Sequence, residues 1–486
     1  MSLHRSLHID GTEVPALSGR TTEDVSPYTG AVYARVAAAG PEDVTAAVEV
    51  AEAAFPDWAA LEPFARRRIF LNAADLMEHR SEEAAELMAA EVGGTRPWSR
   101  FNVSVAADIL REAAAAITAP RGDVLASQER GALGLAIREP VGVVAAFSPW
   151  NAPLILGVRA VAAALAAGNT VVLKPSEDAP IACGLFVADT FKAAGLPDGV
   201  LNVVTNDRAD AAVIAETLIA DPRVRAVNFT GSTGVGRVIG TLAAQHLKPA
   251  LLELGGKNSV LVLNDADVDH AVRAAAFSVF MNSGQICMSA DRLLVHADLM
   301  DEFTEKFVAR VAALPCGAPT SQTTIVGPLI SANEANRVAR QVSDAVAKGA
   351  RLLTGGGQPD GALYPPTVLS GLPKDATLYH GEAFGPVAAI TPFTTDDEAI
   401  ALANDTEHGL TCGVITENGT HGLRVARRIR TGIVHVNDQS VGDEPQAPFG
   451  GFGSSGYGRF GGRWGIEAFS NTRWVTLATE QAHYPF

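Results

Sequence analysis

Cysteine is scarce in this sequence. The 486 residues include four cysteines, Cys183, Cys287, Cys316 and Cys412, which lie far apart and form neither a CxxC pair nor another metal-ligand spacing. This distribution argues against a disulfide framework and against a zinc site, so no bound metal is expected. Free thiols are typical of a reducing compartment, and the sequence therefore predicts a cytoplasmic protein.

Basic residues and long apolar runs are limited as well. The formal net charge is −16 and the pI is near 5.2, which argues against a surface for nucleic acid or for an anionic membrane. Charge, proline or glycine interrupts each apolar stretch before it reaches membrane-spanning length, and the first residues lack the apolar core of a signal peptide. Neither a nucleic acid nor a membrane is predicted as a partner.

A chain of 486 residues with 47% apolar residues is expected to form two or more domains. From residue 141 onward, short apolar runs alternate with helical patterns, as in a parallel sheet that is covered on both faces. Ligands of such sheets bind at the carboxyl ends of the strands, where the polar turns of this chain lie. The strands predicted for this first unit are 141–147, 170–173, 200–204, 224–229 and 250–253.

Further elements are predicted around this unit. Residues 1–40 read as short strands with a hairpin turn at Asp10-Gly11, and 122–139 read as an exposed ribbon. Helices are predicted from Pro41, from Arg66 to Met88, at about 107–119, at about 154–167 and near Pro180. A second α/β run is predicted from 259 to about 431, with strands near 259–263, 293–295 and 388–391. An ordered glycine-rich loop at 450–462 and a segment at 472–486 that pairs with another strand follow it.

The segment MNSGQICM, residues 281–288, places Cys287 in a polar bend that contains glycine. Glu253 ends an apolar run upstream, in LELGGKN at residues 252–258. A thiol and a carboxylate are the minimum for covalent catalysis that ends in hydrolysis. A lone cysteine also serves as a small hydrophobic core residue, and both interpretations remain open on these residues alone.

Three other polar turns are candidates for ligand binding. Gly231, Gly234 and Gly236 follow a strand and open a helix, which favours either a phosphate-binding turn or close helix–strand packing. Glu177, with Lys174 before it, follows the second strand, where a carboxylate can accept the hydroxyls of an adenosine ribose. Asn151 follows the first strand and could donate to an oxyanion or cap a helix.

Taken together, these segments closely resemble the NAD(P)-dependent aldehyde dehydrogenase superfamily. The resemblance extends over nearly the whole chain, with the family's motifs in the family's order. The motifs are FSPWNAP (147–153), GNTVVLKPSE (168–177), FTGSTGVG (229–236), LELGGKN (252–258), GQIC (284–287), EAFGPV (382–387) and PFGG (448–451).

The resemblance implies an α/β fold with a Rossmann-like parallel-sheet cofactor domain, a second α/β catalytic domain and a small β ribbon for oligomerisation. The expected boundaries are 1–121 with 141–255 for NAD binding, 256–454 for catalysis, and 122–140 with 470–486 for oligomerisation. Members of the family are dimers or tetramers, so a homodimer or homotetramer is expected.

The resemblance also implies roles in catalysis. Cys287 matches the nucleophile that adds to the aldehyde to give a thiohemiacetal, whose oxyanion Asn151 and the Cys287 N–H would hold. Hydride transfer to the nicotinamide would leave a thioester, and Glu253 matches the base that activates water to release the acid. The matching cofactor-binding residues are Ser148, Pro149, Trp150, Lys174, Ser176, Glu177, Gly231, Ser232, Gly236, Leu254, Glu382 and Phe384. NAD is the expected cofactor, with NADP possible but less favoured, because Glu177 would face the 2′-phosphate of NADP.

The expected substrate is an aromatic aldehyde of the benzaldehyde, vanillin or salicylaldehyde type. The segments 284–289 and 436–451 look most like those of bacterial dehydrogenases for these aldehydes, and an apolar, methionine-rich channel with one small residue suits a flat ring. The residues expected to line it are Leu156, Gly157, Arg159, Met281, Ile286, Met288 and Phe449.

Two alternatives remain open. Arg159 falls where succinate semialdehyde dehydrogenases place a carboxylate-binding arginine, so an enzyme of that type or one for diverse aliphatic aldehydes is the second interpretation. Their companion arginine is replaced here by Met281, and Arg159 could equally form a salt bridge within the protein. A structural protein that keeps the fold without catalysis is disfavoured, because Cys287 and Glu253 are both present.

Overall fold

Strand β8 (Val143–Ser148) lies inside the first sheet, and all six of its residues are buried. Val144 and Ala146 pack into one hydrophobic core, whereas Val143, Ala145 and Phe147 pack into another. Side chains of a strand alternate between the two faces of its sheet, so a strand that is apolar at every position needs a core on each face. The computed structural model, which describes residues 3–128, 131–481 and 484–486, thus confirms the predicted buried parallel strand.

The first sheet has eight strands in the order β22-β12-β11-β8-β9-β10-β2-β3. Its five central strands are parallel, whereas β22 and β2 pair antiparallel at either side of them. The predicted parallel strands are therefore confirmed. Their bounds are β12 (Ala250–Glu253), β11 (Val224–Thr230), β9 (Thr170–Pro175) and β10 (Leu201–Val203), and the outer strands are β22 (Gly456–Tyr457), β2 (Leu7–Ile9) and β3 (Thr12–Val14).

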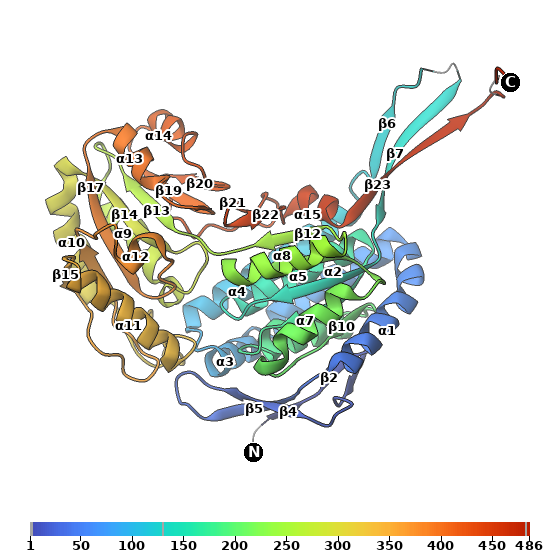
Figure 1. Ribbon diagram of the computed structural model, residues 1–486, viewed down its shortest axis with the longest axis horizontal. Coiled ribbons are helices and arrows are strands. Elements are labelled where there is room, and N and C mark those ends of the chain that lie inside the picture. Colours follow the sequence, from blue (N-terminus) through green and yellow to red (C-terminus); the bar gives the residue numbers. More distant parts are fainter. Residues whose placement is uncertain (1–2, 129–130, 482–483) are drawn as a thin grey trace.

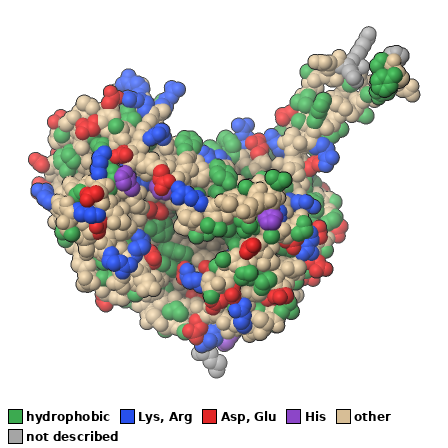
Figure 2. All heavy atoms as spheres, in the orientation of Figure 1, with side chains coloured by type: hydrophobic (Ala, Val, Ile, Leu, Met, Phe, Trp, Pro, Cys, Tyr) green, Lys and Arg blue, Asp and Glu red, His purple; other side chains and the backbone are tan. Residues whose placement is uncertain are grey.

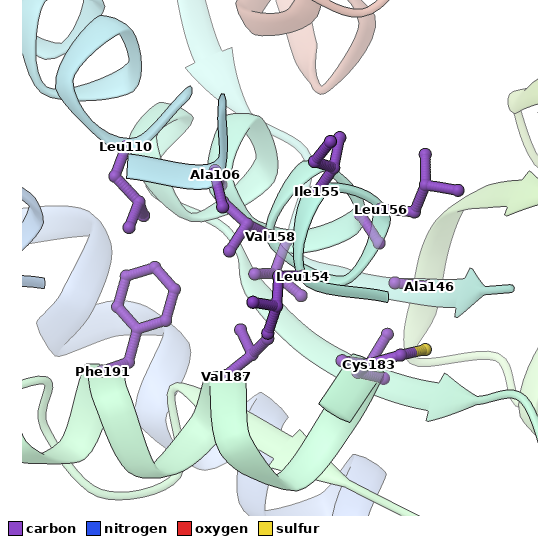
Figure 3. Close-up of a cluster of buried hydrophobic side chains, with 14 of the residues drawn as sticks. Ala106, Leu110, Ala146, Leu154, Ile155, Leu156, Val158, Cys183, Val187 and Phe191 are labelled. Carbon is purple, nitrogen blue, oxygen red and sulfur yellow. The ribbon is translucent and has the colours of Figure 1, made fainter. Parts of the chain in front are cut away.

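Helix α5 (Pro153–Ala167) covers one face of this sheet and is buried on nearly all sides. A helix that is hydrophobic all round belongs in the interior of a protein, and α5 packs between the sheet and helix α4 (Arg96–Ile117). Figure 3 shows Leu154, Ile155 and Val158 of α5 among side chains of α4, of the π-helical turn η1 (Ile181–Leu185) and of α6 (Phe186–Ala193). The other face is covered by α1 (Pro41–Ala60), α7 (Ala211–Ala220) and α8 (Thr233–Gln245).

Two helix boundaries differ from the prediction. The helix predicted from Arg66 to Met88 is two helices, α2 (Pro63–His79) and α3 (Ser81–Glu91), which are separated at Arg80. The helix predicted at about 107–119 is the second half of α4, which begins at Arg96. Apolar spacing continues across the one-residue break, so periodicity alone does not reveal it.

The second sheet has seven strands in the order β15-β16-β17-β14-β13-β19-β20, and only β15 is antiparallel to its neighbour. The three strands predicted here are confirmed as β13 (Asn258–Val262), β14 (Ala290–His296) and β17 (Val387–Phe393). The short strands β15 (Arg351–Thr354), β16 (Thr367–Ser370), β19 (Thr411–Ile415) and β20 (Ile433–Val436) were not predicted. The main helices around the sheet are α9 (Val268–Phe280), α10 (Met300–Ala312), α11 (Ala332–Ala347), α13 (Asp396–Ala403) and α14 (Gly419–Ala426).

A three-stranded arm projects from the body of the molecule (Figure 1). It consists of β6 (Gly122–Leu125), β7 (Ala132–Pro140) and β23 (Ser470–Ala478). Strand β23 pairs antiparallel with β7 over its whole length, which confirms that the last part of the chain pairs with another strand. The glycine-rich loop is ordered, as predicted, because β22 within it adds to the first sheet and α15 (Gly462–Ala468) follows.

The N-terminal segment forms two short units. The hairpin turn at Asp10-Gly11 joins β2 to β3, and both turn residues have a positive φ, as a tight two-residue turn requires. The strands β1 (Leu3–Arg5), β4 (Thr21–Val25) and β5 (Val32–Ala37) form a separate small sheet. Within the described residues, no helix is long and apolar enough to cross a membrane, and no cluster of metal-ligating side chains occurs.

Candidate active site

A cavity of about 770 Å³ lies at the carboxyl ends of β8, β11 and β12. The surface is hollowed between the two large lobes, the first built on the first sheet and the second on the second sheet (Figure 2). The second lobe contributes the cysteine bend and the segment after α12 (Thr377–His380). The cavity brings together many of the predicted site residues, namely Pro149, Trp150, Asn151, Leu156, Arg159, Gly231, Ser232, Glu253, Leu254, Cys287, Glu382, Phe384 and Phe449.

The bend before Cys287 has an unusual backbone. Asn282, Ser283 and Gly284 have φ values of 49°, 56° and 72°, a left-handed conformation that costs non-glycine residues about 1–2 kcal/mol each. Side-chain hydrogen bonds hold it, because Asn282 donates to the Asn151 carbonyl at 2.9 Å and Ser283 donates to the Gly327 carbonyl at 2.9 Å. A Cβ at Gly284 would lie 2.1 Å from the Gly385 carbonyl oxygen, so only glycine fits there.

Asn151 is buried at the cavity wall and is bonded to the bend. Its side-chain amide donates to the Gln285 carbonyl at 2.9 Å. Because an amide group has two N–H bonds, the second remains free to donate to a ligand. The carbonyl of Asn151 also accepts a hydrogen bond from the Trp98 indole at 3.0 Å, which fixes this turn against α4.

Burial shapes the acid–base properties of Cys287 and Glu253. Burial first, and the nearby charge of Glu253 second, raise the pKa of the Cys287 thiol to about 12. Burial also raises the pKa of Glu253 well above its usual value, although the guanidinium groups of Arg159 and Arg459 oppose the shift. Neither carboxyl oxygen of Glu253 has a hydrogen-bond partner among the described residues. A buried carboxyl group without partners is costly, so this arrangement is suited to a water or a ligand.

Cys183 is a different kind of thiol. It is fully buried in the core, where η1 meets α5 and β8 (Figure 3). Its Sγ lies 2.9 Å from the Ser148 hydroxyl, and burial raises the pKa of the Cys183 thiol to about 12. Cys183 does not line the cavity, whereas Cys287 does. The cavity therefore distinguishes the two buried thiols, and the candidate nucleophile is Cys287.

One end of the cavity has the features of a phosphate and ribose site. Gly231 and Ser232 line it at the start of α8, where Ser232 caps the helix by accepting from the Val235 N–H. A Cβ at Gly234 would meet no atom within 4 Å, so the backbone of this first turn is open to an approaching group. Asp178 and Arg208, which were not predicted, form an ion pair at the same end of the cavity.

Lys174 and Glu177 form an ion pair beside this end. Burial alone would raise the pKa of Glu177, but the Lys174 ammonium, together with hydrogen bonds from Lys174, the backbone and Asn206, outweighs burial, so the net shift is downward. Glu177 lines a neighbouring cavity of about 410 Å³, which shares Asp178 and Arg208 with the first. The carboxylate is thus ionised and lies next to the candidate ribose site.

Glu382 and Phe384 line the opposite part of the cavity. The Gly256 N–H donates to Glu382 at 3.2 Å, and burial, with the charge of Asp291, raises the pKa of Glu382 to about 8. Phe384 has a φ of 45° and meets the Trp150 ring edge to face, with ring centroids 5.7 Å apart. Trp150 and Phe384 together form an aromatic wall.

Arg159 lines the cavity and forms a buried ion pair. Its guanidinium donates to Asp443 at 2.5 Å and lies 4.2 Å from the centre of the Phe449 ring. Asp443 was not predicted as a site residue. No local sequence signal links two residues that are 284 positions apart.

The other predicted residues do not line this cavity. Gly157 faces η1, where a Cβ would lie 2.4 Å from the Cys183 carbonyl oxygen, so packing against η1 accounts for the glycine. Met281 packs at the edge of the main hydrophobic core and Ile286 and Met288 are buried in it. The three residues Ser148, Ser176 and Gly236 are not part of the lining either, and Gly236 instead packs against Leu254.

Comparison with known proteins yields one family. The model of the aldehyde dehydrogenase family matches residues 14–475. Vanillin dehydrogenase of Pseudomonas sp. (strain HR199 / DSM 7063) is 50% identical over 482 residues, which cover 99% of each chain. Benzaldehyde dehydrogenase (NAD+) of Pseudomonas putida is 40% identical over 469 residues, or 96% of this chain and 95% of that one. The solved structure of a salicylaldehyde dehydrogenase from Pseudomonas putida G7, complexed with salicylaldehyde, has a TM-score of 0.97 at 39% identity and 100% coverage of both chains.

Proposed function

The chain belongs to the aldehyde dehydrogenase family, and on that premise we propose that it oxidises aromatic aldehydes to carboxylic acids with NAD as the preferred cofactor. Family membership makes it an oxidoreductase that uses a nicotinamide cofactor. The aromatic substrates in the names of its relatives support the aromatic part of the proposal. One observation carries the catalytic part: the Cys287 thiol and the unpartnered Glu253 carboxyl group line the same cavity.

The first step is addition of the Cys287 sulfur to the aldehyde carbon. A C–S bond forms as the carbonyl π bond breaks, the thiol proton passes to a water molecule, and the carbonyl oxygen becomes an oxyanion. The free N–H of the Asn151 side chain and the N–H of Cys287 are the donors proposed for this oxyanion. Because the Asn151 amide is already anchored to Gln285, its orientation is set before the substrate arrives.

The last step is hydrolysis of the thioester on Cys287. Glu253 removes a proton from water, the resulting hydroxide attacks the acyl carbon, and the C–S bond breaks to release the acid. When bound, the nicotinamide accepts the hydride that converts the first adduct into this thioester. The residues proposed to hold the cofactor are those at the phosphate and ribose end, namely Lys174, Glu177, Gly231 and Ser232, with Trp150, Leu254, Glu382 and Phe384 toward the thiol.

We also propose that the chain is divided into cofactor-binding, catalytic and oligomerisation segments. Residues 1–121 and 141–255 would bind the cofactor, 256–454 would supply the thiol, and 122–140 with 470–486 would mediate assembly into a homodimer or homotetramer in the cytoplasm. The exposed apolar side chains on the arm support assembly, with Val124 and Trp474 each 75% exposed and Leu477 58% exposed. Free cysteines, Cys316 among them on the surface, support a reducing compartment.

The substrate proposal is tested by steady-state kinetics with benzaldehyde, vanillin, salicylaldehyde and succinate semialdehyde. We expect higher kcat/KM for the three aromatic aldehydes, because Leu156 and Phe449 give the cavity wall beside the thiol an apolar character. The second candidate is a semialdehyde dehydrogenase, which the position of Arg159 on the same wall favours. A higher kcat/KM for succinate semialdehyde would replace the aromatic proposal with this one.

The cofactor preference is tested by comparing kcat/KM for NAD and NADP. Glu177 is ionised beside the ribose site and would repel a 2′-phosphate, whereas Lys174 partly offsets its charge. We expect a clear preference for NAD that Glu177→Gln reduces or inverts. The nearby Asp178–Arg208 ion pair is unchanged in that variant, so a change in cofactor preference is attributed to the charge of Glu177. A wild-type enzyme that prefers NADP would contradict the proposal.

A further inference from the structure

The ion pair between Arg159 and Asp443 is buried in the wall of the catalytic cavity. The Arg159 side chain is 6% exposed and the Asp443 side chain 3% exposed, and the two are joined by a hydrogen bond of 2.5 Å. Arg159 comes from α5 and Asp443 from the loop after β20, so the pair joins the two halves of the site. A buried guanidinium needs a counter-ion, because an unpaired charge in the interior is strongly unfavourable.

Arg159 lies at a boundary between two cavities. With Phe449 it lines both the catalytic cavity and a narrow second cavity next to Ile109 and Ala113. Its guanidinium stacks on the Phe449 ring, which keeps it at the wall instead of in the open space. The Arg159 charge also acts on both Cys287 and Glu253, so an aldehyde at the thiol lies within its electrostatic range.

We propose that Asp443 determines substrate charge specificity: by neutralising Arg159, it makes the cavity select uncharged aldehydes and reject aldehydes that carry a carboxylate. The inference rests on the proposed aldehyde oxidation and narrows its substrate class. Asp443 acts through Arg159 and is a positioning residue, because it is bonded to the guanidinium and does not itself line the cavity.

The charges around the thiol support this assignment. A carboxylate on the substrate would have to compete with the Asp443 carboxylate for Arg159, the guanidinium that lines the cavity. Like charges that are brought together in a partly buried site repel each other strongly. Leu156 and Phe449, which line the cavity with Arg159, add no positive charge beside it, and Arg459, the other cation that acts on Glu253, does not line the cavity. The Arg159–Asp443 pair therefore has no excess cation to offer a substrate.

Asp443→Asn is the variant that separates the charge of Asp443 from its shape. Asparagine is isosteric and can still accept a hydrogen bond from Arg159, but it leaves the guanidinium without a counter-ion. A substrate carboxylate would then supply the missing charge. The measurement is the ratio of kcat/KM for 4-carboxybenzaldehyde to kcat/KM for benzaldehyde, which we expect to rise about tenfold or more in Asp443→Asn. A general loss of activity does not change this ratio.

The double variant Arg159→Gln/Asp443→Asn is the matched control. It removes both charges, so the ratio should stay within about twofold of the wild-type value. An unchanged ratio in Asp443→Asn, or an equal rise in the double variant, would overturn the proposal. If Asp443→Asn does not fold, Arg159→Gln alone decides the question, because it leaves Asp443 unpaired and should lower the ratio; a ratio that stays the same or rises there would also overturn it.

Failure of the proposed function gives a different result. A wild-type enzyme that oxidises aliphatic aldehydes but neither benzaldehyde nor 4-carboxybenzaldehyde would disprove only the aromatic substrate class. The same variants are then compared with butanal and succinate semialdehyde, a pair that differs chiefly by the carboxylate. A rise of about tenfold in the succinate semialdehyde to butanal ratio for Asp443→Asn would still support the role of Asp443, and no change would refute it.

Discussion

Burial favours the protonated forms of the two reacting side chains of the site. The pKa of the Cys287 thiol is raised to about 12 and that of Glu253 is raised well above its usual value, in both cases chiefly by burial. A neutral thiol is a weak nucleophile, so addition to an aldehyde has to be accompanied by removal of the thiol proton. Both groups become more active as pH rises, because a raised pKa moves ionisation to higher pH.

The roles of Cys287 and Glu253 predict different defects when each is replaced. Cys287→Ala should abolish turnover, because no covalent adduct can form. Glu253→Gln should slow hydrolysis more than acylation, so a burst of NADH of about one equivalent per site should precede slow turnover. Stopped-flow absorbance at the NADH band measures both effects.

Cys183→Ala provides the matched thiol control for this experiment. Cys183 lies in the core beside Ser148, and its replacement should leave kcat within about twofold of wild type. Near-normal kcat in Cys287→Ala, or loss of activity in Cys183→Ala with the fold intact, would transfer the nucleophile role to Cys183.

The sequence was sufficient to locate the candidate site residues that lie in turns with a recognisable motif. Asn151, Glu253 and Cys287 follow strands or bends that the motifs mark, and the structure places all three on one cavity. Asp443 could not be predicted, because its role depends on a contact with a residue 284 positions away. Gly157 was interpreted as a channel residue, but the contact that accounts for it is with η1, a turn whose position depends on tertiary packing.

At the level of elements, a pair of carboxyl groups joins strand β4 to the end of helix α3. Glu91 of α3 accepts hydrogen bonds from the N–H groups of Ile181 and Ala182, each at 2.7 Å, and so fixes η1. Asp24 of β4 is buried beside it. Burial first, and the charge of Asp24 second, raise the pKa of Glu91, and burial likewise raises the pKa of Asp24.

These raised pKa values predict that stability falls as pH rises. Both carboxyl groups bind protons more tightly in the folded state, so their full contribution to stability is present below the unfolded pKa values of about 4 and is lost as pH rises through the folded values. Asp24→Asn removes one ionising group, so the Tm of the variant relative to wild type should increase by about 2 °C or more between about pH 5.5 and pH 8. Calorimetry at both pH values measures this difference.

Glu23→Gln is the control on the same strand. Glu23 is exposed and pairs with Arg35 in solvent, so its replacement should shift Tm by the same small amount at both pH values. If Asp24→Asn also gives a Tm difference that does not vary with pH, the carboxyl pair does not control the stability of this contact.

Element boundaries were predicted less well than element types. The parallel strands of the first sheet followed from runs of apolar residues, which a two-sided core demands. The break at Arg80 has no such signal, since the Arg80 side chain is fixed by Thr190 and Phe186, both from α6. Contacts of this kind depend on the finished fold and not on the local spacing of apolar residues.

At the level of the whole molecule, the arm exposes several large apolar side chains. Val124, Trp474 and Leu477 are largely exposed, and hydrophobic side chains lie along the arm in Figure 2. Large exposed apolar side chains on a narrow sheet are typical of an interface. The sequence predicted that the two segments of the arm pair, but not what covers their faces.

Trp474→Asp should therefore lower the molecular mass of the protein in solution. A charge in place of the exposed indole would be buried without a partner in an interface, which weakens assembly. Sedimentation velocity is expected to show a smaller species for this variant. Leu17→Asp is the control, since Leu17 is 74% exposed and belongs to the loop between β3 and β4 and not to the arm, and it should leave the mass unchanged. An unchanged mass for Trp474→Asp would remove the arm from the interface.

The pairing of β23 with β7 has a consequence for biosynthesis. Residues 132–140 leave the ribosome long before residues 470–478. The backbone groups on the β23 edge of β7 therefore stay unpaired while the rest of the chain is synthesised. Strand β22, which completes the first sheet beside Glu253, also arrives late. The nascent chain thus carries an open strand edge throughout most of its synthesis, and the outer edge of β12, which ends at Glu253, is covered only when translation is almost complete.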